Sequence, residues 1–87
     1  MFELTIDRGV ERALKKLPRD AVVSILNAIQ ELGTEPRPQG YRKIVGTDHC
    51  FRIRVGDYRI IYELDDSRSL VVIHAAGHRK DVYRGFE

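Results

Sequence analysis

Three arginines stand on two short stretches that alternate between polar and apolar residues: Arg52 and Arg54 in residues 50–55, and Arg59 just after them. A guanidinium group is planar and presents paired N–H donors that match the oxygen atoms of a phosphate. It also stays charged at any working pH. These residues could therefore bind a phosphodiester and stabilise negative charge that develops on it.

The residues between the two stretches predict how the arginines are arranged. Gly56-Asp57 is a two-residue connection with glycine where a type II′ turn needs a positive φ angle, so residues 50–62 are predicted to form a β-hairpin. In that register Arg54 lies opposite Arg59, and Arg52 shares their face. Opposed like charges destabilise a sheet by roughly 0.2–1 kcal/mol, which a bound anion would relieve. The alternative is that the arginines merely decorate a solvated sheet face.

The stretch "GHRKDVYRG" near the end of the chain adds candidates. If residues 78–83 are helical, Arg79 and Tyr83 lie four apart on one face, a cation for phosphate and a ring to stack on a base. His78 could transfer protons near neutral pH. The alternatives are that Tyr83 packs on the sheet edge and that His78 is an ordinary surface residue. No histidine, cysteine or carboxylate spacing predicts a metal site, and no cofactor is expected.

The elements that must position these residues follow from the hydrophobic pattern. Residues 1–6 alternate as a short strand, and two one-faced helical patterns follow around Pro18, the first capped by Asp7 and the second stopped by Gly33. Residues 34–43 are predicted to be a loop. The hairpin, a strand over 70–75 and a short C-terminal helix or turn complete the chain. The prediction is an α+β fold, β-α-α-β-β-β, with a two-helix hairpin packed on a small, mainly antiparallel sheet.

Composition narrows the class of protein. The 87 residues suit a single domain, 1–87, and the 43% hydrophobic and 32% charged fractions are those of a globular chain. No apolar run could cross a membrane and no signal peptide is evident, so a cytoplasmic protein is expected. One cysteine, Cys50, excludes an internal disulfide. Residues 37–60 hold six basic and two acidic side chains, which concentrates positive charge around the hairpin.

The element order, "RVGDYRIIYEL" in the hairpin and "GHRKDVYR" near the end resemble the RelE/ParE superfamily of bacterial and archaeal toxins, nearest the RelE branch. The resemblance covers essentially the whole chain. It implies the toxin of a type II toxin–antitoxin system, a metal-independent endoribonuclease that cuts messenger RNA in the ribosomal A site. The implied partners are the ribosome, messenger RNA and a cognate antitoxin, with the toxin monomeric alone and oligomeric with its antitoxin.

The family's catalytic positions fall by motif on Arg52, Arg54, Arg59, Arg79 and Tyr83, with His78 as a possible acid or base. Further basic residues are expected to contact RNA: Arg42, Lys43 and Lys80. The best-studied RelE members carry lysine where this chain has Arg52 and Arg54. Because arginine effectively cannot lose its proton, these two residues could stabilise charge but not act as a general base.

Two other functions fit the same resemblance. ParE-type relatives inhibit DNA gyrase without cutting RNA, and they generally lack the basic catalytic set. A relative that has lost catalysis could act only in an antitoxin complex and in gene regulation. The five retained positions favour the nuclease, whereas arginine at positions 52 and 54 keeps the inactive relative as an alternative.

Overall fold

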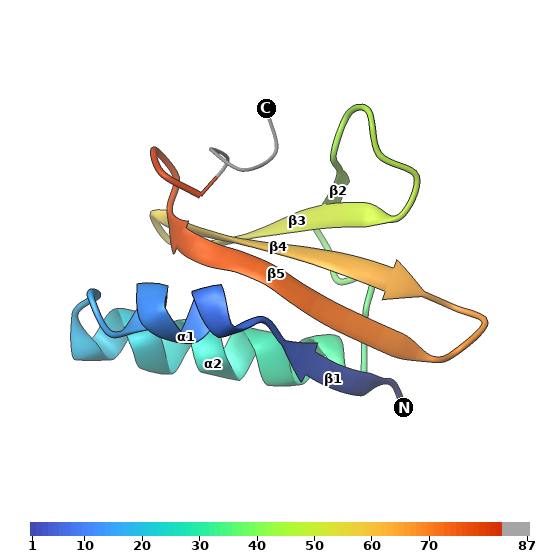
Figure 1. Ribbon diagram of the computed structural model, residues 1–87, viewed down its shortest axis with the longest axis horizontal. Helices are drawn as coiled ribbons and strands as arrows, with labels where there is room; N and C mark the ends of the chain where they lie inside the picture. Colours follow the sequence, from blue (N-terminus) through green and yellow to red (C-terminus); the bar gives the residue numbers. More distant parts are fainter. Residues whose placement is uncertain (83–87) are drawn as a thin grey trace.

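The computed structural model describes residues 1–82, which fold into a mixed sheet with two helices on one side of it (Figure 1). None of the helices in this range is long and apolar enough to cross a membrane. The α+β class and the two-helix layer are confirmed. The elements in chain order are β1 (Glu3–Ile6), α1 (Arg8–Leu14), α2 (Arg19–Leu32), β2 (Arg42–Lys43), β3 (Cys50–Val55), β4 (Tyr58–Asp65) and β5 (Leu70–His78).

The helices begin and end near the predicted residues, but the interactions at their ends differ from those expected. Pro18 precedes α2, where its fixed φ angle suits a helix start. Gly33 is the C-cap of α2, as predicted, and has a right-handed φ of −67°. Its lack of a side chain matters because an added Cβ would lie 3.3–3.4 Å from Gln30, Leu4 and Phe2. Asp7 stands at the N-cap of α1, yet its side chain makes no capping hydrogen bond.

The core lies between the helices and one face of the sheet. Ile25, Ile29 and Leu32 of α2 are buried there, at the i, i+4 and i+7 spacing of one helical face. The strands contribute alternate residues to the same cluster: Ile53, Ile60, Tyr62, Leu64, Val71, Ile73 and Ala76. Because strand residues alternate between faces, their neighbours point away from the helices, and these include the hairpin arginines.

The sheet is mainly antiparallel, as predicted, and differs from the prediction at two strands, β2 and β5. Its order is β1-β5-β4-β3-β2, and β1 pairs with β5 in parallel while the other pairs are antiparallel. Residues 34–43 are not all loop, because Arg42 and Lys43 form the short edge strand β2. The last strand reaches His78 instead of ending at residue 75, and a bulge shifts its register so that Ile61 pairs with Ala75 but Tyr62 with Ile73.

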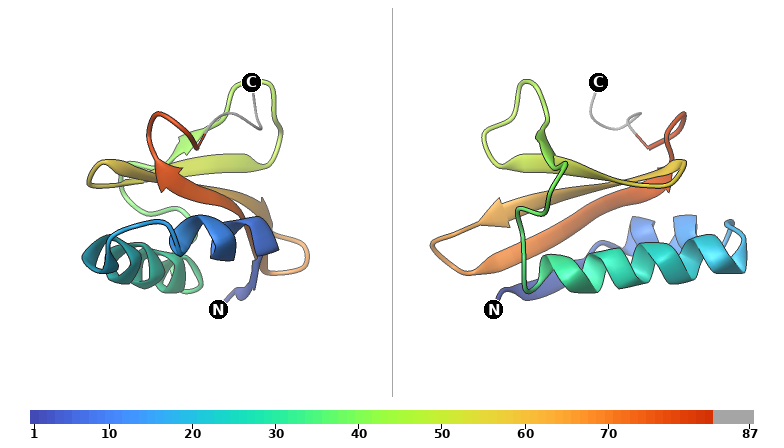
Figure 2. Two further views of the ribbon diagram at one scale, coloured as in Figure 1. Left: turned by 60° about the vertical axis from the view of Figure 1, so that its left-hand side comes forward. Right: turned by 180° about the vertical axis from the view of Figure 1, so that it is seen from behind.

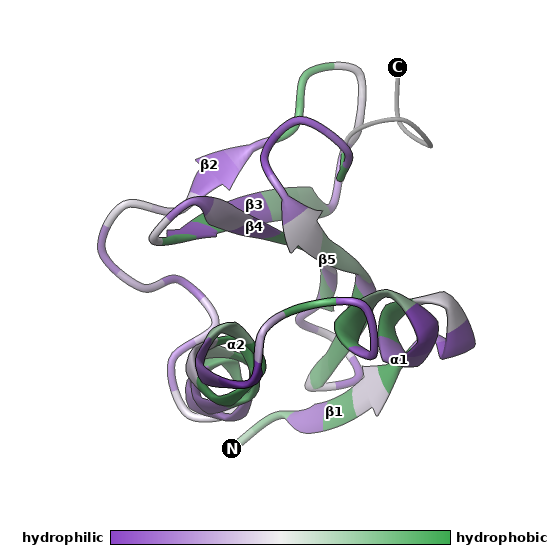
Figure 3. Cartoon of the chain, turned by 90° about the vertical axis from the view of Figure 1, so that its left-hand side faces the viewer, coloured by the Kyte–Doolittle hydropathy of each residue, from purple (hydrophilic) through white to green (hydrophobic). Residues whose placement is uncertain are grey.

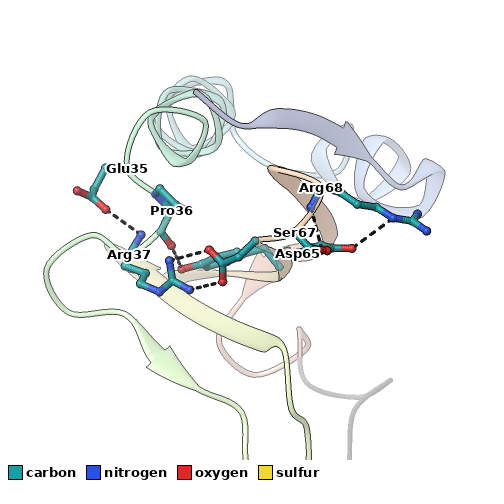
Figure 4. A network of polar contacts seen from close by, with 8 residues as sticks. Glu35, Pro36, Arg37, Asp65, Ser67 and Arg68 are labelled. Atoms are coloured by element: carbon teal, nitrogen blue, oxygen red, sulfur yellow. Dashed lines mark hydrogen bonds and ion pairs between the residues drawn. The ribbon is translucent and has the colours of Figure 1, made fainter.

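Two contacts fix the long segment that leads from α2 to β2 (Figure 4). The buried Tyr62 hydroxyl donates a 2.7 Å hydrogen bond to the Pro36 carbonyl. Burial raises the pKa of that hydroxyl, so it remains a donor. Arg37 binds both oxygens of Asp66, at 3.1 and 2.6 Å, and this lowers the pKa of the Asp66 carboxyl. The segment is thus tied to β4 and to the β4–β5 turn, which determines where β2 lies.

Replacing Tyr62 with phenylalanine is expected to lower the free energy of unfolding by about 1–3 kcal/mol, because a buried carbonyl loses its donor while the ring still fills the core. Urea denaturation measures this change. Tyr58→Phe, which removes a hydroxyl from a half-buried ring, is the matched control and should change stability less. Equal stability of Tyr62→Phe and the unaltered chain would contradict the anchoring role.

Candidate functional site

The predicted hairpin register is confirmed. Val55 pairs with Tyr58 across a turn in which Gly56 has a φ of +60°, and Arg54 pairs with Arg59. Two residue pairs further along, Arg52 lies opposite Ile61. All three arginines therefore share the sheet face that points away from the helices, as the alternation predicts.

A fourth arginine joins this face through β2. Arg42 pairs directly with Arg52, so their side chains lie on the same side of the sheet. We call the set Arg42, Arg52, Arg54 and Arg59 the arginine face. Arg42 was expected to contact RNA, but its pairing was missed because a two-residue strand carries no readable period. Within residues 1–82, no carboxylate forms an ion pair with any member of the set.

The guanidinium groups of Arg54 and Arg59 converge on the hairpin turn. Arg54 Nε donates to the Gly56 carbonyl at 3.1 Å, and one terminal nitrogen of Arg59 lies 3.4 Å from the same oxygen. The Arg59 nitrogen also donates to the Tyr58 carbonyl at 3.0 Å. These carbonyl oxygens offset part of the repulsion between the two cations. Since each guanidinium has five N–H donors, most remain available to an anion.

Small residues on β5 leave room beside these cations. Gly77 pairs with Arg59 and Ala75 with Ile61, so the strand next to the hairpin carries little side-chain bulk on this face. A Cβ built on Gly77 would meet nothing within 4 Å. Within residues 1–82, the surface next to Arg59 is therefore open to a ligand. Sequence reasoning gave Gly77 and Ala75 no role, because their alignment with the arginines depends on the pairing of β4 with β5.

Arg79 is attached to the same turn through its backbone. Its N–H donates to the Asp57 carbonyl at 3.1 Å, and residues 79–82 form a turn instead of a helix. This turn lies on the side of the sheet away from the helices (Figure 2). Arg79 and Lys80 are exposed in it, while Val82 is buried. The structure therefore brings Arg79 and Lys80 to the end of the sheet that holds Arg54 and Arg59.

Two of the predicted site residues, Lys43 and His78, lie on the helix side of the sheet and not on the arginine face. Lys43 pairs with Phe51, which packs on the helix side of the sheet, so Lys43 does not join the arginine face. His78 pairs with Tyr58 and their rings meet edge to face at 6.0 Å, again on the helix side. Its Nδ1 accepts a hydrogen bond from the Lys80 N–H at 3.2 Å. Tyr83 lies outside the described residues, and its role stays a prediction.

Cys50 is not placed as a nucleophile. It is half-buried at the start of β3, and burial, together with the nearby Glu63 carboxylate, raises the pKa of its thiol. A raised pKa lowers the fraction of reactive thiolate. The arrangement of the arginine face suits binding of a phosphodiester and stabilisation of negative charge on it.

Known proteins resemble this chain in both sequence and fold. The family described as the ParE toxin of type II toxin–antitoxin systems, parDE, matches residues 4–83. Toxin RelG of Mycobacterium tuberculosis is 38% identical over 77 residues, which are 84% of this chain and 85% of that protein.

Two solved structures superpose well on the chain. The RelE–RelB complex of Pyrococcus horikoshii has a TM-score of 0.80 and 28% identity, covering 93% of this chain and 98% of that one. The toxin–antitoxin complex RelBE2 of M. tuberculosis has a TM-score of 0.79 and 26% identity, covering 90% and 98%. With a family match over nearly all of its length, this chain belongs to the RelE/ParE superfamily of type II toxin–antitoxin toxins.

Proposed function

We propose that this toxin is a metal-independent endoribonuclease that cuts messenger RNA in the ribosomal A site. The observation that carries the proposal is the direct pairing of Arg54 with Arg59, whose guanidinium groups converge on one carbonyl. Two opposed cations do not stabilise a sheet, whereas together they can bind the oxygens of a scissile phosphate.

In the proposed reaction the messenger's own 2′-hydroxyl attacks the adjacent phosphate in line. Its proton leaves to a base, the bond from phosphorus to the 5′-oxygen breaks, and that oxygen takes up a proton. The products are a 2′,3′-cyclic phosphate and a free 5′-hydroxyl. Arg54 and Arg59 stabilise the extra negative charge of the pentacoordinate state, and Arg52 positions the phosphate.

The remaining residues take roles at the edges of this site. Arg79 neutralises the leaving oxygen from its turn beside the hairpin, and Tyr83 stacks on a displaced nucleotide. Arg42 and Lys80 extend the positive surface along the RNA backbone. None of the arginines can accept the proton, and His78 lies on the other side of the sheet. Of the acid or base candidates considered from the sequence, we therefore favour Tyr83 or a group of the ribosome as the base.

A cognate antitoxin is the proposed inhibitor. The two superposed complexes each pair a RelE-type toxin with an antitoxin. On this chain Val23 and Leu26 of α2 are 52% and 44% exposed, an apolar pair at i and i+3 on the outside of the helix. An acidic partner chain that wraps around the domain could cover this pair with an apolar face and, on the opposite side, the arginine face, which would otherwise bind RNA with little selectivity.

The competing function is gyrase inhibition, since the matching family is described by its ParE member. We expect the purified chain to cut messenger RNA only when ribosomes are translating it, and to leave DNA gyrase supercoiling unchanged. Primer extension locates the cuts, and a supercoiling assay runs beside it. Inhibition of gyrase with the messenger RNA left intact would show that the chain acts as a ParE-type gyrase inhibitor. No effect in either assay, and none on bacterial growth, would show that it is a catalytically inactive relative.

A further inference from the structure

A second cluster of reactive side chains lies on the same sheet face, away from the hairpin turn. Cys50 of β3, Glu63 of β4 and His74 of β5 each offer one ligand atom, and the three atoms lie within 4.8 Å of one another. Cys50 and Glu63 are direct cross-strand partners, and His74 is the residue that the bulge in β5 leaves unpaired in the register. Each is half-buried and so remains within reach of a dissolved ion.

We propose that these three residues form a binding site for a divalent transition metal, with zinc as the preferred ion. A thiolate, an imidazole nitrogen and a carboxylate oxygen are the donor types that Zn²⁺ uses in proteins, whereas Ca²⁺ and Mg²⁺ prefer oxygen alone. With metal–ligand bonds of about 2.0–2.3 Å, the atoms of a tetrahedral site stand roughly 3.5 Å apart. The widest separation, at most 4.8 Å, therefore needs to shorten by about 1 Å, while His74 Nε2 and the Glu63 oxygen, 2.9 Å apart, need to separate slightly.

The histidine is already oriented for such a role. Its Nε2 lies 2.9 Å from a Glu63 oxygen, inside the cluster, and its Nδ1 lies 3.4 Å from an oxygen of Asp7. Metal-binding histidines characteristically donate their second N–H to a carboxylate, which fixes the ring and raises its basicity. Asp7 is thus the positioning residue. This contact also explains why Asp7 stands at the N-cap of α1 without a capping hydrogen bond.

The site is separate from the proposed nuclease centre. Cys50 and Glu63 stand four residues from Arg54 and Arg59 along their strands, about 13 Å away. A bound metal would join three neighbouring strands at the end of the sheet opposite the hairpin turn. Because an ion that binds only the folded state stabilises it, the proposed consequence is a metal-dependent rise in stability. The proposal is independent of RNA cleavage, and its tests use no RNA.

Cobalt provides the direct test. The purified full chain, freed of metal with a chelator, is titrated with Co²⁺ and then with Zn²⁺. We expect a thiolate-to-cobalt charge-transfer absorption at one ion per chain, which zinc abolishes. Since Cys50 is the chain's one cysteine, the signal identifies its ligand. Cys50→Ser and His74→Ala should each lose it, and His49→Ala, which removes an exposed histidine outside the cluster, should keep it.

Two further measurements complete the test. Zinc should raise the unfolding temperature of the unaltered chain but not of Cys50→Ser. Asp7→Asn, which retains a side chain suited to the N-cap, should bind zinc about 10–100-fold more weakly in competition with a chelator. The proposal is overturned if the unaltered chain shows no charge-transfer band, if the band survives in His74→Ala, or if one ion binds per two chains as a dimer.

Discussion

Replacing Arg59 with alanine is expected to lower the rate of ribosome-dependent cleavage by about 10²–10³-fold, the loss that follows removal of one well-placed donor to a developing oxyanion. Arg59 lies directly opposite Arg54 and beside the open surface at Gly77, where the proposed phosphate would contact its guanidinium. Single-turnover cleavage of messenger on stalled ribosomes measures the effect. Arg59→Lys keeps the charge but loses the planar guanidinium, so its cleavage rate should lie between those of the unaltered chain and Arg59→Ala.

Stability separates a catalytic role for Arg59 from a structural one. Opposed like charges destabilise a strand pair, so Arg59→Ala should be as stable as the unaltered chain, or more so. Lys43→Ala is the matched control, since it removes one cation from the neighbouring strand pair but from the helix side of the sheet. The assignment fails if Arg59→Ala cuts at the original rate, or if Lys43→Ala loses as much activity.

The hairpin could be predicted because its information is local. A two-residue connection with glycine first, flanked by alternating residues, allows few registers, and one of them buries Ile53 and Ile60 together. The placement of Arg54 and Arg59 on one face follows from that register alone. The α+β class followed in the same way from periods of 3.6 and 2 along the chain.

The features that could not be predicted from the sequence depend on contacts between residues that are far apart in the chain. Arg42 joins the arginine face through its pairing with Arg52, and the segment before it is held by Tyr62 and Asp66, which lie 26 and 29 positions from their partners Pro36 and Arg37. Figure 3 shows β2 as a short hydrophilic strand at the sheet edge, with no apolar alternation to reveal it. The position of His78 on the helix side likewise depends on how far β5 extends.

The residues of the proposed metal site could not be predicted either, because they come together through the bulge in β5. One extra residue between the partners of Ile61 and Tyr62 is enough to turn His74 toward Glu63. A bulge of this kind has no reliable sequence signature when it lacks glycine. Cys50, Glu63 and His74 are far apart in the chain, so their spacing predicted no metal site although the fold gathers them.

Replacing Gly56 with valine is expected to lower both stability and cleavage. Gly56 has a φ of +60°, which costs a residue with a side chain about 1–2 kcal/mol. An added Cβ would meet nothing within 4 Å, so the cost is conformational and not steric. A turn that relaxes to negative φ moves the carbonyl that holds Arg54 and Arg59 together, and the two cations then separate.

The control for this change is Gly46→Val, because Gly46 also has a positive φ, +86°, and open space around it, but lies in the loop before β3. Both variants should lose about 1–2 kcal/mol in urea denaturation. Only Gly56→Val should also cleave messenger RNA more slowly per folded molecule. Gly56→Asn should recover most of the activity, since asparagine tolerates this φ better than other side chains do. Equal cleavage per folded molecule in the two valine variants would show that the turn does not align the arginines, and the proposed site would have to be abandoned.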